Sequence, residues 1–197
     1  MIIGITGGTG SGKTTVLELL RTLGYQVLDC DAIYHRLLRE DPHLLNAIES
    51  RFPGVVSEGQ LRRKKLGQQV FGDPEALTDL NRITHGAVIA EVKRLLTPDT
   101  AIDAIALFES GLDALCDLTV AVTAPMEQRV ARLVARDQVT EEYARSRIAA
   151  QQSDGWYAGH CDCILENSGT AAEFRGKCLA FFSEQGIMKK KPDGGTP

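Results

Sequence analysis

Apolar residues along the chain fall into five short runs separated by stretches with helical spacing. The runs lie at residues 2–6, 25–28, 101–108, 118–122 and 163–165. Between them, apolar positions recur every three or four residues, as at Val16, Leu19, Leu20 and Leu23, a spacing typical of amphipathic helices. Short buried strands that alternate with helices predict an α/β fold in which helices cover both faces of a parallel sheet.

The segment between the second and third runs is too long for a single crossover and predicts several helices. Asp41-Pro42 and Asp73-Pro74 are typical helix starts, and Pro53-Gly54 is typical of a break. The apolar stripes then predict two consecutive helices. The first carries Leu77, Leu80 and Ile83, and the second carries Val88, Ile89, Val92, Leu95 and Leu96. We expect this insertion to hold a second substrate.

Toward the C-terminus the pattern predicts a helical pair at residues 125–138 and 140–152. Thr170 and Glu173 have the spacing of a capping box, which predicts that a last helix begins there. The tail, residues 188–197, lacks apolar periodicity, and we expect it to be a frayed end.

The turn between the first strand and the first helix matches a phosphate-binding loop. Gly7, Gly12, Lys13 and Thr14 fit the pattern G-x-x-x-x-G-K-[ST] in full. In such loops, successive backbone N–H groups cradle phosphate oxygens, and the positive end of the following helix faces the same anion. Lys13 is then expected at the β- and γ-phosphates and the Thr14 hydroxyl on Mg²⁺. The sequence therefore predicts binding of a nucleoside triphosphate.

Composition narrows the class of protein further. The formal net charge of −4 and the pI near 5.6 predict no general attraction to nucleic acid or to an anionic membrane. No apolar stretch approaches the roughly 20 residues that a membrane span needs, and no signal segment precedes the first strand. We therefore expect a cytoplasmic protein. Its five cysteines include Cys161 and Cys163, whose spacing favours reduced thiols over a zinc site or a disulfide.

Two acidic residues, Asp29 and Asp31, lie at the end of the second predicted strand. Ligands of open α/β sheets bind at the carboxyl ends of the strands. Either carboxylate could take a proton from an attacking hydroxyl or hold Mg²⁺ through water. Asp31 could instead cap a helix at residues 32–38.

Basic residues offer further candidates. Arg129, Arg132 and Arg136 share one face of a predicted helix, opposite Val130, Leu133 and Val134. They could close over a triphosphate or form a solvated surface; we favour the first, at least for Arg136.

The remaining candidates are less decided. The cluster at residues 62–65 could bind phosphates of the second substrate or be ordinary surface charge. Glu109 ends the third apolar run, and could hold a water on Mg²⁺ or cap a turn. His85 lies beside an apolar stripe. Considered on its own, it is better interpreted as a structural histidine.

Together these segments resemble the dephospho-coenzyme A kinase family, from about Ile2 to Phe174. Besides the phosphate loop, the resemblance rests on an ordered series of short segments: 28–32, 63–67, 70–71, 80–85, 107–112, 128–133, 136–137, 147–151 and 166–169. A phosphate loop is shared by very many enzymes, whereas this series is far more selective.

The resemblance implies a P-loop kinase with a five-stranded parallel core at residues 1–33, 98–124 and 153–187. It also implies a helical substrate-binding insertion at 34–97 and a helical lid at 125–152. The implied reaction transfers the γ-phosphoryl group of ATP to the ribose 3′-hydroxyl of dephospho-coenzyme A, with Mg²⁺.

The resemblance also assigns residues. Asp31 matches the family's general base, and this match outweighs the capping alternative. The resemblance further implies that Lys13 and Arg136 are catalytic residues beside Asp31. Arg63 and His85 match positions that face the acceptor substrate, and we add Glu109 to them. The residues expected to bind ATP are Gly8, Thr9, Gly10, Ser11, Gly12, Lys13, Thr14, Thr15, Arg132, Arg136, Asn167 and Gly169. Thr14 is the expected Mg²⁺ ligand, with Asp29 or Glu109 as candidates through water.

Two departures from the family pattern concern local backbone geometry more than activity, and a third, at Cys30, is mild. Gly86 and Ile105 stand where the family commonly has proline, and Cys30 replaces a small residue. A kinase for nucleotides or nucleosides is the nearest alternative function. A GTPase-type switch is disfavoured because the N-K-x-D and D-x-x-G segments are missing from the sequence. The expected partner is a small molecule rather than nucleic acid or membrane, and the expected state is a monomer or a weak homo-oligomer.

Overall fold

The computed structural model describes residues 1–187, so the expected frayed tail at 188–197 lies outside the described residues. The chain divides into two compact units. The first contains Met1–Val27, Thr97–Phe108 and the chain from Asp113 onward, and the second contains Leu28–Leu96 and Glu109–Leu112. Each unit is described by itself below.

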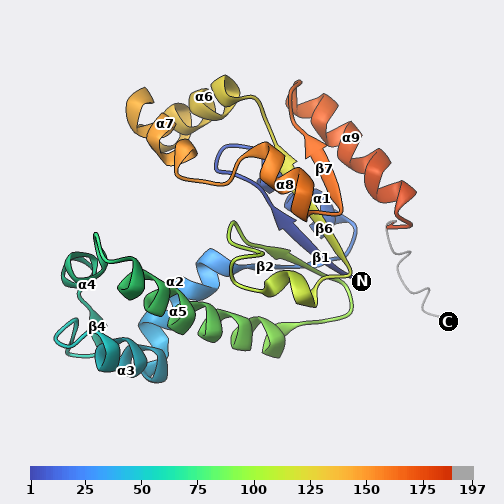
Figure 1. Ribbon diagram of the computed structural model, residues 1–197. Helices are drawn as coiled ribbons and strands as arrows, with labels where there is room; N and C mark the ends of the chain where they lie inside the picture. Colours follow the sequence, from blue (N-terminus) through green and yellow to red (C-terminus); the bar gives the residue numbers. More distant parts are fainter. Residues whose placement is uncertain (188–197) are drawn as a thin grey trace, which may run out of the picture. The chain divides into compact units, whose positions relative to one another are not determined.

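A five-stranded sheet contains β1 (Ile2–Thr6), β2 (Gln26–Asp29), β5 (Thr100–Asp103), β6 (Leu118–Thr123) and β7 (Cys163–Glu166). Their order is β2-β5-β1-β6-β7 (Figure 1). β1 pairs in parallel with β5 on one side and with β6 on the other, and β6 pairs in parallel with β7. The predicted fold class is confirmed. The strand formed by the third apolar run, residues 101–108, is shorter than that run, and it ends at Asp103 of β5.

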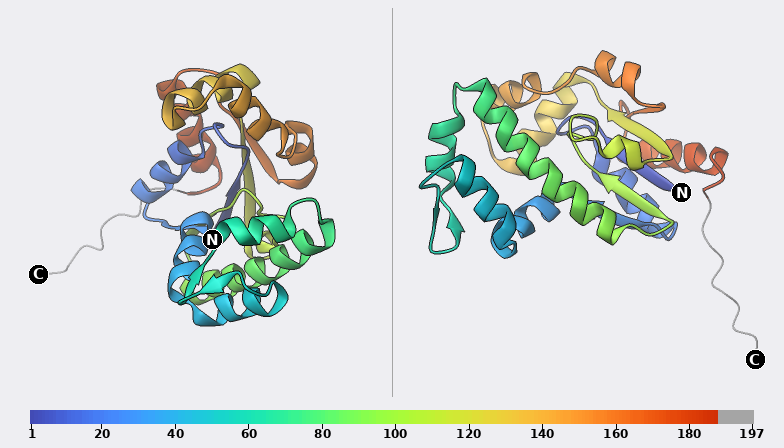
Figure 2. Two further views of the ribbon diagram at one scale, coloured as in Figure 1. Left: turned by 90° about the vertical axis from the view of Figure 1, so that its left-hand side faces the viewer. Right: turned by 60° about the horizontal axis from the view of Figure 1, so that its bottom comes forward.

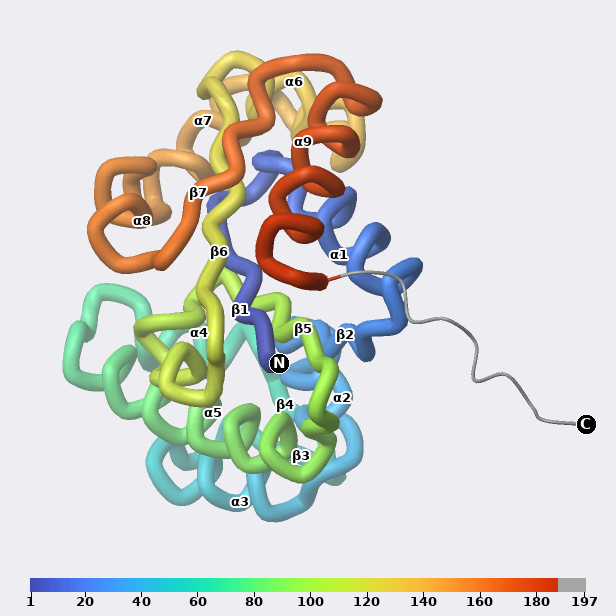
Figure 3. Tube along the Cα trace, turned by 90° about the vertical axis from the view of Figure 1, so that its right-hand side faces the viewer, coloured from blue at the N-terminus to red at the C-terminus, as the bar shows by residue number. Residues whose placement is uncertain are grey.

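Helices cover both faces of this sheet. α1 (Lys13–Thr22) and α9 (Ala171–Glu184) lie on one face, and α8 (Asp154–His160) lies on the other (Figure 3). Ile3 and Ile5 of β1 are fully buried against apolar residues of α1 and α9, such as Leu20 and Phe182. α9 begins with the predicted capping box between Thr170 and Glu173. This packing, together with pairing to β5 and β6, holds β1 in place, and with it the loop that follows β1.

The second unit is helical. It contains α2 (Cys30–Glu40), α3 (Pro42–Arg51), α4 (Arg63–Val70) and α5 (Pro74–Leu95), with a small hairpin of β3 (Val56–Ser57) and β4 (Gln60–Leu61). Asp41 and Asp73 cap α3 and α5, each followed by a proline in the first turn, as predicted.

The prediction of two helices between residues 74 and 96 is wrong. α5 is a single helix of 22 residues, seen as one long green helix in Figure 2. Its interior contains no proline, and Gly86 alone weakens a helix by only about 1 kcal/mol. The two apolar stripes therefore belong to one helix, and Leu77, at 48% exposure, is not part of the core.

α6 (Met126–Asp137) and α7 (Glu141–Ala149) form a helical hairpin in the first unit. Val130 and Leu133 pack against Ala144 and Ile148 in a small apolar cluster of their own. The prediction that Val134 shares this apolar side is wrong, since the side chain is 37% exposed. We call α6 and α7 the lid hairpin. A short 3₁₀ helix at Leu112–Leu115 precedes β6.

Candidate active site

The loop between β1 and α1 has the backbone of an anion-binding site. Gly12 is the N-cap of α1 in a left-handed conformation (φ 108°), and no side chain caps the first N–H groups of that helix. Glycine adopts such a φ without steric cost. A helix N-terminus with uncapped N–H groups attracts anions, because the helix dipole and the donors point the same way. We call residues 7–14 the phosphate loop.

The side chains of the loop divide into buried and accessible ones. Thr9 and Ser11 are 7% and 1% exposed, so their side chains are not accessible to a ligand. The Lys13 ammonium donates to the Gly7 carbonyl at 2.8 Å, which keeps it beside the loop. Thr14 is exposed on the first turn of α1. At the start of α1, the side chains of Lys13 and Thr14 are thus accessible to a ligand.

Three consecutive carbonyls of the loop are bound by side chains from elsewhere in the first unit. Arg129 Nε donates to Thr9 O at 3.0 Å. Arg132 Nη1 donates to the carbonyls of Gly10 and Ser11 at 3.0 and 3.2 Å, and Asn167 Nδ2 donates to Ser11 O at 2.8 Å. The N–H groups of Gly10 and Gly12 point away from the Thr9 and Ser11 carbonyls of the same peptide units. Because these carbonyls are held on one side, the two N–H groups can face the other side, where phosphate binds in such loops.

Arg136 lies two turns beyond Arg129 on α6, and its side chain is exposed. Its Nε donates to Asp137 Oδ1 at 2.7 Å, and Asp137 also accepts from Arg147 at 3.0 Å. These guanidinium groups hold the pKa of the Asp137 carboxyl below its usual range. The predicted face of three arginines is therefore divided. Arg129 and Arg132 bind the phosphate loop, while Arg136 is held at the outer end of α6.

A hollow of about 360 Å³ lies at the carboxyl end of β7. Its lining comes from the β7–α9 turn and from α9: Glu166, Ser168, Gly169, Glu173, Phe174 and Lys177. Gln128 of α6 donates to the Ser168 carbonyl at 2.8 Å, which ties this turn to the lid hairpin. Gly169 and the neighbouring Asn167, both predicted to lie near ATP, therefore border the hollow and the phosphate loop respectively.

In the second unit, Asp29 and Asp31 have different surroundings. The Asp29 carboxylate caps α2 by accepting from Ala32 N at 2.9 Å. Asp31 is exposed on the first turn of α2. The capping alternative for Asp31 is therefore wrong, and its carboxylate lies on the surface of the helix.

Arg63 lies close to the same helix. Its Nη2 is 3.2 Å from His35 Nδ1, and His35 follows Asp31 by four residues, which places both on one face of α2. The nearby Tyr34 hydroxyl has a raised pKa because it is buried, an effect that the Arg63 charge partly opposes. Asp31 and Arg63, predicted to contact the acceptor, are thus associated with the same helix.

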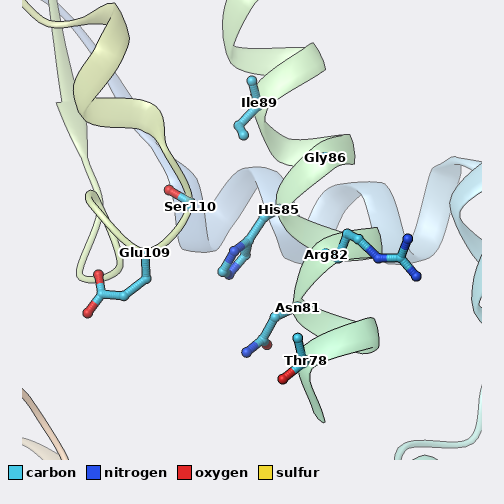
Figure 4. A pocket seen from close by; sticks show the side chains of 8 residues that line it. All are labelled: Thr78, Asn81, Arg82, His85, Gly86, Ile89, Glu109 and Ser110. Atoms are coloured by element: carbon cyan, nitrogen blue, oxygen red, sulfur yellow. The ribbon is translucent and has the colours of Figure 1, made fainter. Parts of the chain in front are cut away.

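His85 and Glu109 line another hollow of the second unit, of about 480 Å³. Figure 4 shows His85 and Asn81 projecting from α5 toward the segment of Glu109 and Ser110, while Arg82 points away. Burial lowers the pKa of His85, although the charge of Glu109 and a hydrogen bond with its backbone oppose this effect. The imidazole is therefore neutral at pH 7 and able both to donate and to accept a hydrogen bond.

No group of three or more histidine, cysteine, aspartate or glutamate side chains that could hold a metal ion occurs within residues 1–187. One carboxylate that the sequence analysis did not consider is Asp103. It ends β5, whose register places it beside Ile5 of β1, at the edge of the sheet from which the phosphate loop leaves. The strand order needed to find it is not visible in the sequence.

The five cysteines are free thiols. Burial raises the pKa of Cys116 to about 12 and those of Cys161 and Cys178 to about 11, so these groups stay protonated at pH 7. None of the helices in the described part of the chain is both long and apolar enough to span a membrane.

Comparisons with known proteins agree with the geometry. The family model described as dephospho-CoA kinase matches residues 1–173. A dephospho-CoA kinase of Deinococcus radiodurans is 38% identical over 182 residues, which cover 89% of this chain and 87% of the relative. A crystal structure of a protein from Thermus thermophilus is 37% identical, with a TM-score of 0.75, covering 93% of this chain and 97% of that one. A shikimate kinase from Bacteroides thetaiotaomicron shares the fold at 14% identity, with a TM-score of 0.61, covering 95% of this chain and 99% of that one.

Proposed function

This chain belongs to the dephospho-CoA kinase family, and from that premise we propose that it transfers the γ-phosphoryl group of ATP to the ribose 3′-hydroxyl of dephospho-CoA. The products are CoA and ADP, and the reaction is the last step of CoA synthesis. The observation that carries the proposal is the intact phosphate loop, with Lys13 and Thr14 accessible at the start of α1. The family-specific segments around it select the acceptor.

ATP is held, in this proposal, by the first unit. The N–H groups of the phosphate loop other than those of Thr9 and Ser11 surround the β- and γ-phosphates. The Lys13 ammonium moves from the Gly7 carbonyl to the phosphate oxygens. The adenine ring enters the hollow beside Gly169, whose lining comes from the β7–α9 turn and α9. Arg132 and Asn167 act through the loop carbonyls to which they donate.

The available donors fit Mg²⁺, a hard cation that prefers oxygen ligands and usually keeps only one or two from the protein. Thr14 supplies a hydroxyl and Asp103 a carboxylate from the neighbouring strand. We prefer Asp103 to Asp29, whose carboxylate caps α2; Glu109 remains the other candidate. When bound, the ion neutralises charge that develops on the transferring group.

The acceptor is held by the second unit. Asp31 takes the proton of the attacking 3′-hydroxyl, because it is an exposed carboxylate that caps no helix. Arg63 pairs with an acceptor phosphate, and His85 and Glu109 offer hydrogen bonds from their hollow. Arg136, on the lid hairpin, closes on the transferring group and helps to exclude water, which would otherwise compete as the acceptor.

We further propose that the protein acts in the cytoplasm on small molecules alone, as a monomer or a weak homo-oligomer. The five cysteines are free thiols, which is the usual state in a reducing compartment. The net charge of −4 gives no general attraction to nucleic acid.

An acceptor panel tests the proposed substrate. Purified protein with ATP and Mg²⁺ is offered dephospho-CoA, nucleoside monophosphates, nucleosides and shikimate, and kcat/KM is measured by coupled ADP detection. Dephospho-CoA should exceed every other acceptor by about a hundredfold or more, as expected where buried polar groups reject a poorly matched substrate. A higher kcat/KM for a nucleotide, a nucleoside or shikimate would assign a different kinase reaction.

A further inference from the structure

Both backbone polar groups of Thr9 in the phosphate loop are bonded to side chains at the base of the lid hairpin. The Thr9 carbonyl accepts from Arg129 Nε at 3.0 Å, and the Thr9 N–H donates to Gln151 Oε1 at 2.8 Å. Arg129 Nη2 also donates to Gln151 Oε1, at 3.1 Å. Three residues that are far apart in the sequence thus form a closed ring of hydrogen bonds.

The guanidinium group in this ring is buried. Arg129 is 6% exposed, and the carboxylate nearest to it is that of Asp154, at 4.0 Å and half-exposed. A buried charge is costly unless hydrogen bonds replace its hydration. Here the backbone carbonyl of Thr9 and the amide of Gln151 replace it, which makes the position of the guanidinium depend on the loop and on the lid hairpin together.

The space around Gly8 shows how closely the loop and Arg129 fit. A Cβ at position 8 would lie 2.0 Å from Arg129 Nη2 and 3.1 Å from Gln151 Oε1. A Cβ at Gly10 would lie 2.8 Å from the Arg129 carbonyl oxygen. The glycines of the loop therefore make room for α6 as well as for phosphate.

We propose that Arg129 and Gln151 are a positioning pair that fixes the Thr9 segment in its triphosphate-binding conformation and ties the lid hairpin to the phosphate loop. Its catalytic consequence rests on the proposed function. The two residues lie at opposite ends of the hairpin, Arg129 on the first turn of α6 and Gln151 two residues beyond α7. Both ends of the hairpin are thereby anchored to the loop.

Along α6 the bonds to the loop extend as far as Arg132, which donates to the Gly10 and Ser11 carbonyls, and Arg136 lies beyond them. Arg136 follows Arg129 by seven residues, which is about 10 Å along a helix. The hairpin also has its own apolar cluster, around Leu133 and Ile148, and can keep its shape as a body. Arg136 can then approach bound ATP while the base of the hairpin stays on the loop.

The test is the dissociation constant of ATP, measured by calorimetry with Mg²⁺ for the wild type, Arg129→Lys, Gln151→Leu and the double variant. Arg129→Lys keeps the positive charge, so we expect the variant to fold. Its ammonium group cannot donate to both Thr9 and Gln151, so the hydrogen-bond ring is broken. Each single change should weaken ATP binding about tenfold or more, the usual effect of losing a charge-assisted or buried hydrogen bond. The double variant should lose less than the sum, because one ring is broken in all three.

Steady-state kinetics separate positioning from a general structural role. The KM for dephospho-CoA at saturating ATP should stay within about twofold of the wild type, since both residues act on the ATP side. Arg145→Lys is the matched control. Arg145 lies on α7 and bonds to Glu127 and Glu141 of the same hairpin, so its change should leave the affinity for ATP unaltered.

Two outcomes would overturn the proposed positioning role of Arg129 and Gln151. One is wild-type ATP affinity in both folded single variants, even if their melting temperatures fall. The other is an equal loss of ATP affinity in Arg145→Lys. If the wild type binds ATP but does not phosphorylate dephospho-CoA, the proposed function is wrong, while the affinities still decide the role of Arg129 and Gln151.

Discussion

Asp29 and Asp31 are two residues apart, yet local backbone geometry gives them different chemistry. Asp29 has the extended conformation of an N-cap, and its carboxylate accepts a hydrogen bond from Ala32 N. Asp31 is already on the helix, where its carboxylate is free of that duty and exposed. A general base must reach its substrate, and of the two only Asp31 offers an accessible carboxylate without a capping role.

Asp31→Asn should therefore lower kcat by about a hundredfold or more while ATP binding stays within about twofold, since general-base catalysis contributes at least that factor. Asn has nearly the same shape, so folding should not change. Turnover is followed by coupled ADP release and ATP affinity by calorimetry. Near-normal turnover in a variant that binds ATP would remove Asp31 from the role of base.

At the scale of elements, the phosphate loop depends on α6 as much as on β1 and α1. The carbonyls of Thr9, Gly10 and Ser11 are all bonded by side chains from outside the loop. A loop with several glycines has high conformational freedom when unfolded or unliganded. The guanidinium groups of Arg129 and Arg132 restrict that freedom before ATP arrives, which lowers the entropic cost of binding.

Gly8→Ala tests this support without backbone strain, because the φ of Gly8 is not positive. The new methyl group would lie 2.0 Å from Arg129 Nη2 and must displace the guanidinium from its hydrogen bonds. We expect ATP affinity to fall about tenfold or more, as for loss of those bonds. Gly176→Ala in α9, where a Cβ meets nothing within 4 Å, is the control. Equal ATP affinities for the two variants would contradict this interpretation of the loop.

At the scale of the whole molecule, each compact unit carries its own half of the predicted chemistry. The first holds the phosphate loop, the hollow beside Gly169 and the lid hairpin, and the second holds Asp31, Arg63, His85 and Glu109. Within the second unit, Glu91 of α5 joins two helices by accepting from Arg36 of α2 and from Arg94 at 2.7 Å. These arginines lower the pKa of Glu91 to about 2.

The stability contributed by Glu91 should therefore depend on pH. A lowered carboxyl pKa means stabilisation that is complete above the ordinary value of 4.5 and is lost as the pH falls toward about 2. Glu91→Gln should reduce the free energy of unfolding at pH 7 by about 1 kcal/mol, since water screens the two partly exposed arginines. Urea denaturation at pH 7 and pH 3 measures the difference between wild type and variant. A difference that does not shrink at pH 3 would show that the charge is not its cause.

Local sequence patterns predicted what depends on neighbours along the chain. The phosphate loop, the capping box of α9 and the proline starts of α3 and α5 each require only a few adjacent residues, and the structure contains them. Apolar runs also predicted the strands of the sheet, most clearly β1 and β6, which are buried and apolar. Periodicity could not tell one long helix from two, because an apolar stripe looks the same on either side of a residue such as Gly86.

The features that the sequence did not reveal depend on contacts across the fold. Arg129 looks like its surface neighbours in a helical pattern, and only the packing of α6 on the loop shows that it is buried. Gln151 and Asp103 become candidates only when their contacts or the strand order are known. The family resemblance supplied Asp31 and His85, whose position alone left alternatives open.

The identities of the two products test the central claim most directly. Protein, ATP, Mg²⁺ and dephospho-CoA are incubated together, and ADP and the phosphorylated acceptor are quantified, with the new ester located by ³¹P–¹H correlation NMR. The account predicts CoA carrying a phosphate on the ribose 3′-oxygen, formed in equal amount to ADP. ADP formed without CoA, or a phosphate on any other oxygen, would contradict it.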